Sequence, residues 1–277
     1  MRRIIFVLAD GLRPDAVSPA LMPSLLALAE TYTHATRART VRPSATVAAL
    51  ASLATGVSPE THRLIEPGLS FLPRLRTVRP VARELSKAGI STAIATSELA
   101  PGALPVAWAL AATAGVRRIV PAGKRARETA ASALQIYGER QEGLLFVYLP
   151  DCDRIGHQAG WMSKPYLDAA AEVDIAIGML ASRCDDALFI VTADHGGGGV
   201  LPTDHDEPHP LNDAIPVVIA GHGAARRQRL RHEVSILDLP ATILWWLGCE
   251  VPASYEGQPL ALAFDPARAP ALASVPA

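Results

Sequence analysis

The chain of 277 residues has little cysteine and no long apolar segment, and each shortage excludes a class of protein. Its three cysteines, Cys152, Cys184 and Cys249, lie far apart and form no Cys-x-x-Cys pair. A disulfide framework is therefore excluded, and we interpret the cysteines as the reduced thiols of a cytoplasmic protein. No stretch reaches ~18 apolar residues without a charge, so we predict no membrane span.

Net charge is also small, because 26 Lys and Arg stand against 27 Asp and Glu, which gives −1 at neutral pH. Without a basic excess the chain has no field that would draw it onto nucleic acid, so we expect no nucleic-acid partner as a main role. Hydrophobic residues make up 49% and charged residues 19% of the chain. This composition excludes a disordered or collagen-like chain and favours a globular protein with a large core.

The amino terminus imitates a secretory signal peptide, because Arg2 and Arg3 precede the apolar run Ile4–Ala9. The run has only six residues, ends at Asp10 and is followed by no small-residue cleavage site. We therefore interpret it as a buried parallel strand.

Short apolar runs alternate with segments of helical spacing through most of the chain. The predicted strands are Ile4–Ala9, Ile90–Ala95, Arg117–Val120, Leu144–Leu149, Ala187–Thr192 and Ile215–Ala220. The predicted helices are Met22–Tyr32, Ala45–Leu53, Val78–Ala88, Thr129–Arg140, Lys164–Ser182 and Ser235–Leu247. The alternation predicts an α/β fold of three layers, with an open, mostly parallel sheet and helices on both faces.

The chain shows no internal repeat and no Ser/Gly linker, so we expect residues 1–263 to form a single domain. We expect the Ala/Pro-rich tail, 264–277, to be poorly ordered. Leu64–Arg79, which carries prolines and arginines, is interpreted as a surface excursion, and Leu99–Ala114 is left open between helix and loop.

Side chains that can bind a metal follow three of the predicted strands. They are Asp10, Asp153, His157, Asp194 and His195. In an open α/β sheet the ligand crevice lies outside the carboxyl ends of the strands, so these groups should meet at one edge. A single Asp after a strand is more often a turn or cap residue. Turn preference does not readily explain the same chemistry at three strand ends.

The mixture of carboxylate and imidazole suits zinc, and its acidity also admits manganese. Two such ions ~4 Å apart would clamp the attacking and leaving oxygens of a phosphoryl displacement.

Five segments, in order, resemble the alkaline phosphatase superfamily and, within it, the nucleotide pyrophosphatase/phosphodiesterase branch. They are Asp10–Asp15, Pro43–Gly56, Pro150–His157, Val191–Gly196 and Ser235–Leu260. The third fits the family's D-x-x-G-H element, which selects Asp153 over Asp151. The resemblance covers roughly residues 3–262.

The resemblance implies a two-metal centre and a threonine nucleophile. One ion would be held by Asp153, His157 and His205, and the other by Asp10, Asp194 and His195, with contact to the Thr46 hydroxyl. Thr46 would attack phosphorus and form a covalent phospho-threonine intermediate. The alternative is a purely structural role for Thr46 as the N-cap of the helix, and Ser44 could serve as that cap equally well.

The last histidine ligand must be chosen from His205, His209 and His222. The family's ligand lies eleven residues before the proline that opens the next strand, and counting back from Pro216 selects His205. His209 lies in the same acidic loop and remains a competitor. His34, His62 and His232 have no motif around them and are interpreted as structural or solvated.

In the phosphodiesterase branch an Asn three residues after the nucleophile helps to hold a phosphate oxygen, and in the sulfatase branch an Arg follows the nucleophile by four residues. This chain departs from both patterns, because Ala49 and Leu50 occupy those positions. Donors must then come from elsewhere. We expect Arg154, Lys164 and Tyr166 to bind substrate, and His62 or backbone N–H groups are further candidates.

Together these features predict a two-metal hydrolase of phosphodiesters or nucleotide pyrophosphates that acts on a small-molecule substrate. A phosphonate C–P hydrolase resembling phosphonoacetate hydrolase and a phosphomutase of the same superfamily are the alternatives. A non-catalytic metal-binding relative is the third, and the intact ligand positions argue against it.

Overall fold

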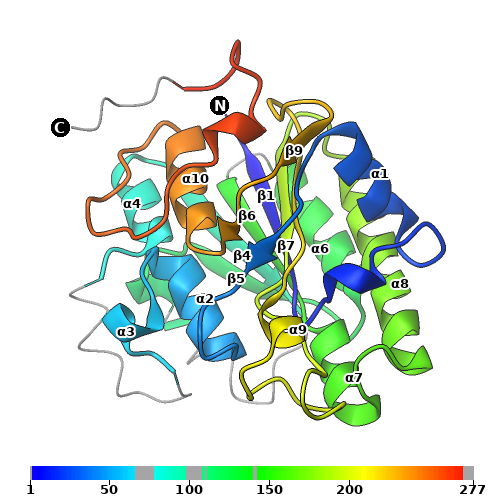
Figure 1. Cartoon of the computed structure of the whole chain (residues 1–277). Coiled ribbons are helices and arrows are strands. Elements are labelled where there is room, and N and C mark those ends of the chain that lie inside the picture. Colours follow the sequence, from blue (N-terminus) through cyan, green and yellow to red (C-terminus); the bar gives the residue numbers. More distant parts are fainter. Residues whose placement is uncertain (1, 66–77, 98–107, 110, 140–141, 271–277) are drawn as a thin grey trace.

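The computed structural model describes residues 2–65, 78–97, 108–109, 111–139 and 142–270, and in these residues a twisted sheet separates two layers of helices (Figure 1). Most of Leu64–Arg79 and of Leu99–Ala114 lies outside the described residues. Within them, no helix has the length and apolarity needed to cross a membrane.

The main sheet has eight strands in the described residues, in the order β5-β4-β6-β1-β7-β8-β2-β9. The first five strands in this order, β5, β4, β6, β1 and β7, are parallel to one another. Strand β8 runs antiparallel to both β7 and β2. Their bounds are β1 Ile4–Ala9, β2 Thr33–Ala35, β4 Ser91–Thr96, β5 Arg118–Pro121, β6 Glu142–Leu149, β7 Leu188–Thr192, β8 Val217–Gly221 and β9 Gln228–Leu230. Two short strands, β3 (Ala38–Arg39) and β10 (Val234–Ser235), form a separate parallel pair.

Helices cover both faces of the sheet (Figure 1). One layer contains α1 (Pro23–Thr31), α6 (Ala126–Gly138), α7 (Asp151–Ala159) and α8 (Lys164–Ala181), which pack on one another. The other contains α2 (Thr46–Thr55), α3 (Pro59–His62), α4 (Val81–Lys87) and α10 (Asp238–Trp246). The short α9 (Pro210–Asp213) lies in the long connection between β7 and β8. The predicted three-layer α/β fold is confirmed.

Strand β1 lies at the centre of the core. All six of its residues are buried, and it pairs in parallel with β6 on one side and β7 on the other. A continuous apolar run is the pattern expected of a strand covered on both faces. The rings of Phe6 and Phe146 stack across β1 and β6 with centroids 5.2 Å apart.

Helix α7 was not among the predicted helices. It follows β6 directly, is short and has polar residues over much of its length, so it lacks the apolar repeat that indicates a helix. It carries Asp153 and His157 on successive turns. Helix α2 begins at Thr46, its N-cap is Ala45, and Ser44 donates a hydrogen bond from Oγ to the His205 carbonyl instead of capping it.

Packing continues past Ala263, where the body of the protein was expected to end. The buried ring of Phe264 stacks on Trp246 with centroids 4.8 Å apart, and the main chain donates a hydrogen bond from Asp265 to the Gly223 carbonyl. Residues 271–277 lie outside the described residues. Of the three free cysteines, Cys152 and Cys184 are buried and Cys249 is partly exposed.

Candidate metal centre

The turns after β6, β1 and β7 meet at one edge of the sheet. Because β1 lies between the other two strands, Asp10 is flanked by Asp153 from one side and by Asp194 and His195 from the other. The main chain joins the first two turns, since Asp153 N donates to Asp10 O at 2.9 Å. The described residues contain two groups of three potential metal ligands, and within each group the ligand atoms all lie within 4.8 Å of one another. The groups are Asp10–Asp194–His195 and Asp153–His195–His205.

Three carboxylate oxygens in this cluster are buried and accept no hydrogen bond. They are Asp10 Oδ1, Asp153 Oδ1 and Asp194 Oδ2, and they lie 3.3, 3.9 and 3.7 Å from His195 Nε2. Buried polar atoms are otherwise nearly always paired, and an unpaired buried carboxylate is costly. A donor set of converging oxygens and imidazole nitrogens therefore fits divalent cations such as zinc or manganese.

Each histidine of the cluster has its Nδ1 atom bound to a backbone carbonyl. His195 Nδ1 lies 2.8 Å from Gly196 O, His205 Nδ1 lies 2.7 Å from Ser44 O, and His157 Nδ1 lies 2.9 Å from Thr203 O. An Nδ1–H that donates to a carbonyl leaves the Nε2 lone pair of the neutral ring for a cation. The Nε2 atom of His157 lies 3.1 Å from His205 Nε2 and 3.3 Å from Asp153 Oδ1, beside the second group.

Two of the three carboxylates, Asp194 and Asp10, are oriented by hydrogen bonds to their other oxygen. Asp194 Oδ1 accepts from the backbone N–H groups of Gly11 and His195, at 3.2 and 3.0 Å. Asp10 Oδ2 accepts from the Tyr148 hydroxyl. In Asp10 and Asp194 one carboxylate oxygen is thereby held by the protein, and the other faces the centre.

Burial and the closeness of like charges shift the pKa values of several of these side chains. Burial, and then repulsion from Asp194 and Asp153, raises the pKa of Asp10 well above its usual range. Burial raises the pKa of Asp153 and lowers that of His205. The protein alone thus disfavours charge here, and a cation would reverse that balance.

Thr46 reaches the same centre from the opposite layer of helices. As the first residue of α2 it places Oγ1 3.1 Å from His195 Nε2. Free N–H groups in the first turn of a helix favour an anion, so this hydroxyl stands at a place suited to phosphate.

Trp161 and Tyr148 support the centre and were missed by sequence reasoning. The Trp161 indole donates from Nε1 to Gly11 O at 2.9 Å and lies edge-on to the rings of His157 and His205. It occupies space left by glycine: a Cβ on Gly197 would lie 2.1 Å from Trp161 Cε2. The available signal was the run of four glycines after His195, Gly196 to Gly199, which leaves room for a large side chain.

Gly11 is required by the close approach of the first two turns. Its φ of +68° favours glycine, and a Cβ there would lie 2.8 Å from the Asp153 Cα. The conformation turns the chain after Asp10 so that the Gly11 N–H reaches Asp194.

The residues expected to bind substrate make other contacts. The buried Tyr166 hydroxyl donates to Gly11 O and accepts from Arg13 N, so it supports the turn after β1. Lys164 is exposed and pairs with Asp168, and Arg154 lies 3.7 Å from Asp151 on its own helix. His62 lies inside the α2–α3 packing, with Nε2 on Ser52.

The structure also separates the histidines that competed for the last ligand position. His205 is buried and packs its ring on His195, with centroids 3.8 Å apart. His209 instead accepts from Leu211 N at the start of α9, and His222 is near Arg268.

The chain matches the family model described as type I phosphodiesterase / nucleotide pyrophosphatase over residues 4–235. GPI ethanolamine phosphate transferase 1 of Candida glabrata is 30% identical over 148 residues, which are 44% of this chain and 16% of that protein. The 2,3-bisphosphoglycerate-independent phosphoglycerate mutase of Staphylococcus aureus is 30% identical over 122 residues, 42% of this chain and 23% of that protein. The chain thus spans less than a quarter of the length of these relatives.

A solved structure with the same fold is the human ectonucleotide pyrophosphatase / phosphodiesterase 5. It superposes with a TM-score of 0.71 at 12% sequence identity, and the match covers 93% of this chain and 97% of that one. At this identity the likeness concerns the fold.

Proposed function

Because the chain belongs to the type I phosphodiesterase / nucleotide pyrophosphatase family, we propose that it is a metal-dependent hydrolase of phosphate esters. The substrates are phosphodiesters or nucleotide pyrophosphates, and the nucleophile is Thr46. The observation that carries the proposal is the convergence on His195 of three unpaired carboxylate oxygens and the Thr46 hydroxyl.

The residues that would hold two divalent ions, zinc or manganese, are Asp10, Asp194 and His195 beside Thr46, and Asp153, His157 and His205. When bound, the ions supply Lewis-acid stabilisation of charge on the phosphoryl oxygens and favour ionisation of a nearby hydroxyl. The protein's part is to hold each ligand atom in place through the backbone contacts of the three imidazoles and of Asp194.

Thr46 would carry the covalent step. Its Oγ1 forms a bond to phosphorus as the bond from phosphorus to the leaving ester oxygen breaks, which gives phospho-threonine and the released alcohol. Water then attacks the same phosphorus, the bond to Oγ1 breaks, and the threonine hydroxyl regains its proton. The remaining phosphate monoester is released.

The test measures metal content together with hydrolysis of bis-p-nitrophenyl phosphate and p-nitrophenyl phosphate. We expect two ions per chain and release of nitrophenolate. Thr46→Ala should lower turnover by about 10³-fold or more while both ions stay bound. Thr55→Ala on the same helix is the matched control, because that hydroxyl only bonds the Ala51 carbonyl, and its activity should be unchanged.

Two results would contradict the proposal. Full turnover by Thr46→Ala would exclude Thr46 as the nucleophile, and the absence of metal after reconstitution with zinc or manganese would exclude the ligand set. Phosphonoacetate as substrate tests the C–P hydrolase alternative, and release of inorganic phosphate excludes a mutase. Cytoplasmic localisation stays a prediction, which fractionation of the producing cell would check.

A further inference from the structure

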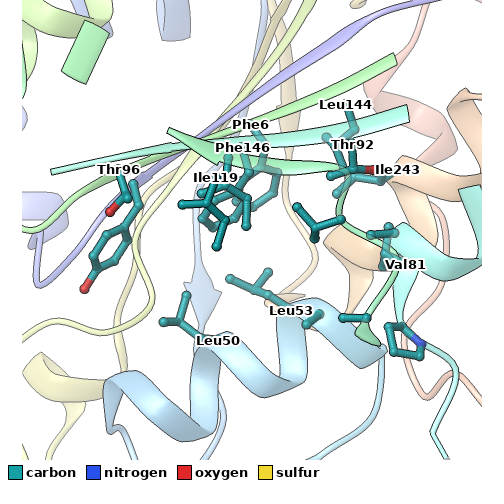
Figure 2. A pocket seen from close by; sticks show the side chains of 17 residues that line it. Phe6, Leu50, Leu53, Val81, Thr92, Thr96, Ile119, Leu144, Phe146 and Ile243 are labelled. Atoms are coloured by element: carbon teal, nitrogen blue, oxygen red, sulfur yellow. The ribbon is translucent and has the colours of Figure 1, made fainter. Parts of the chain in front are cut away.

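The two faces of the main sheet differ in the charge of the side chains between sheet and helices. On the α2 side, Figure 2 shows the apolar side chains of Leu50 and Leu53 facing those of Phe6 and Phe146, and none of the described residues around that space is charged. On the α1 side, a cleft lies between α1 and the strands β8 and β2, and charged side chains line its mouth. Its volume is about 560 Å³, within the range of ~300–1,000 Å³ typical of small-molecule pockets.

The cleft on the α1 side has apolar walls. Its described lining residues belong to two stretches, 14–39 and 210–229, and the structure describes both stretches without a break. Hydrocarbon side chains of α1 and β8 form much of the wall, and they are Leu25, Leu26, Ala29, Val217 and Val218. Such walls favour a ligand with an apolar part, because its burial removes apolar surface from water.

Basic side chains dominate the mouth of this cleft. Arg37 and Arg229 are exposed, and within the described residues neither side chain forms an ion pair or a hydrogen bond. Arg39 is already paired with Glu233 at 2.9 Å. Glu30 is the one acidic residue among the described lining residues, and it lies on α1, whereas the arginines lie on β9, on β3 and before β3. The charge therefore favours an anionic group on the strand side of the cleft.

Protection of a sheet edge explains only part of this charge. In the described residues β9 is at one edge of the main sheet, and charged side chains on an edge strand prevent pairing with a second sheet. Residues 226–231 include four arginines and no acid, in a chain whose net charge is −1. Edge protection does not account for Arg37, which precedes β3, or for the apolar walls beside it.

We propose that this cleft binds a small amphiphile, a single alkyl chain that carries one anionic head group. The alkyl chain lies against α1 and β8, and the head group pairs with Arg37 and Arg229. None of the proposed metal ligands is among the described residues that line the cleft, and neither is Thr46. Binding here is therefore separate from the proposed hydrolysis and does not depend on it.

The test is calorimetric titration of the metal-loaded protein with octane-1-sulfonate, because a sulfonate is a poor ligand for divalent ions. Octan-1-ol and octyltrimethylammonium carry the same chain with a neutral and a cationic head group. We expect the sulfonate to bind about tenfold more tightly than the alcohol, and the ammonium to bind most weakly. Each methylene from hexane- to decane-1-sulfonate should raise the affinity by up to about fourfold. Chelation of the metal should leave these affinities unchanged.

Charge variants locate the head group. Arg229→Gln should weaken sulfonate binding by about fivefold, the upper range for an ion pair open to water. Arg231→Gln is the matched control, because it changes the net charge equally and Arg231 is not among the lining residues. Glu30→Gln should act in the opposite direction and strengthen binding, since it removes the one acid from the described lining.

Bulk variants on α1 locate the alkyl chain. Leu26→Trp should lower the affinity of all three octyl compounds, because Leu26 lines the cleft. Ala27→Trp is the control on the same helix, since Ala27 is exposed and is not among the lining residues. Thermal melts report whether both variants fold.

Three results would overturn the proposal. Equal affinity for the three head groups, or no saturable binding, would exclude an anion site. An equal loss in Arg231→Gln and Arg229→Gln would show attraction to the basic surface as a whole and exclude the cleft as its place. Loss of binding on chelation would locate the probe at the metal centre. Because binding is measured without turnover, a failure of the proposed hydrolysis would leave each of these outcomes readable.

Discussion

Two clusters of buried histidine lie at opposite ends of α2 and differ in how completely they are paired. At the amino end, His195 and His205 meet carboxylate oxygens that accept no hydrogen bond. Toward the carboxyl end, His62 accepts at Nδ1 from Leu64 N and bonds Ser52 Oγ through Nε2, both at 2.9 Å. The polar atoms around His62 are thus hydrogen-bonded, whereas the carboxylate oxygens around His195 and His205 are not.

This difference separates a site from a structural contact. Burial alone does not do so, since His62 and His205 are both at most 5% exposed. The Ser52–His62 pair resembles the start of a catalytic triad, yet Nδ1 receives a backbone N–H and so cannot also donate to a carboxylate. Unpaired ligand atoms, not buried histidines as such, mark the centre.

Metal removal should have the largest effect and act on one cluster only. Chelation should lower hydrolysis by about 10³-fold or more, because the ions supply several kcal/mol of charge stabilisation. It should also lower the melting temperature, since the three carboxylates are left facing one another. Turnover and thermal unfolding before and after chelation check this, and recovery on adding zinc or manganese is the control. Unaltered turnover after complete metal removal would contradict it.

A pair of identical substitutions tests the two clusters directly. His205→Leu should reduce bound metal from two ions to one or none per chain, because it removes a ligand nitrogen. His62→Leu should leave two ions bound. Atomic absorption on both purified variants measures the difference. Equal metal loss in the two would remove the distinction between the clusters.

Trp161 should affect the first cluster without being a ligand. Trp161→Phe removes the Nε1 hydrogen bond to Gly11 O and shrinks the surface behind His157 and His205. We expect metal affinity to fall by roughly 10- to 100-fold, the usual cost of losing an outer contact to a metal site. Competition with a coloured chelator measures it. An unchanged affinity would show that the indole only fills space.

His62→Leu should act on stability alone. The change removes both hydrogen bonds and leaves the Ser52 hydroxyl without its imidazole, at a cost of about 1–2 kcal/mol in the free energy of unfolding. Denaturant unfolding of metal-loaded protein gives the value. Unaltered unfolding would mean that Ser52 finds another partner.

Lowering the pH should reduce the contribution of His62 to the free energy of unfolding. Burial lowers the pKa of His62, against the opposing influence of Glu256 and Glu60. The unfolded chain therefore binds this proton more readily, and stability falls as the pH falls below the unfolded value of about 6.5. The difference in unfolding free energy between the native protein and His62→Leu should narrow from pH 7.5 to pH 5. A constant difference would contradict the shift.

The sequence predicted the alternation of elements and the positions of Asp10, Asp153, Asp194 and His195 because these depend on local pattern. Apolar runs and the residues that end them can be read along the chain. Strand order cannot be read in this way, since β1 pairs with β6, which lies about half the chain length further along (Ile4 with Leu144).

For the same reason the sequence did not reveal the roles of Tyr148 and Trp161. Tyr148 occupies an ordinary place in an apolar strand, and only the pairing of β6 with β1 brings its hydroxyl to Asp10. Trp161 depends on glycines 36 residues further along, which leave room for its ring (161 to 197). The helix that precedes it, α7, has too little apolar character to be recognised from the sequence.

Because β1 lies between β6 and β7, the spacing of the strands fixes the distances between the ligand residues of the metal centre. Neighbouring strands repeat at ~4.8 Å, close to the ~3.5–4 Å that separates paired catalytic ions. Asp153, Asp10 and Asp194 therefore inherit their spacing from main-chain hydrogen bonds, which side-chain replacement leaves in place. The loops around the centre can therefore change in sequence to accept new substrates while the spacing of these three aspartates stays the same.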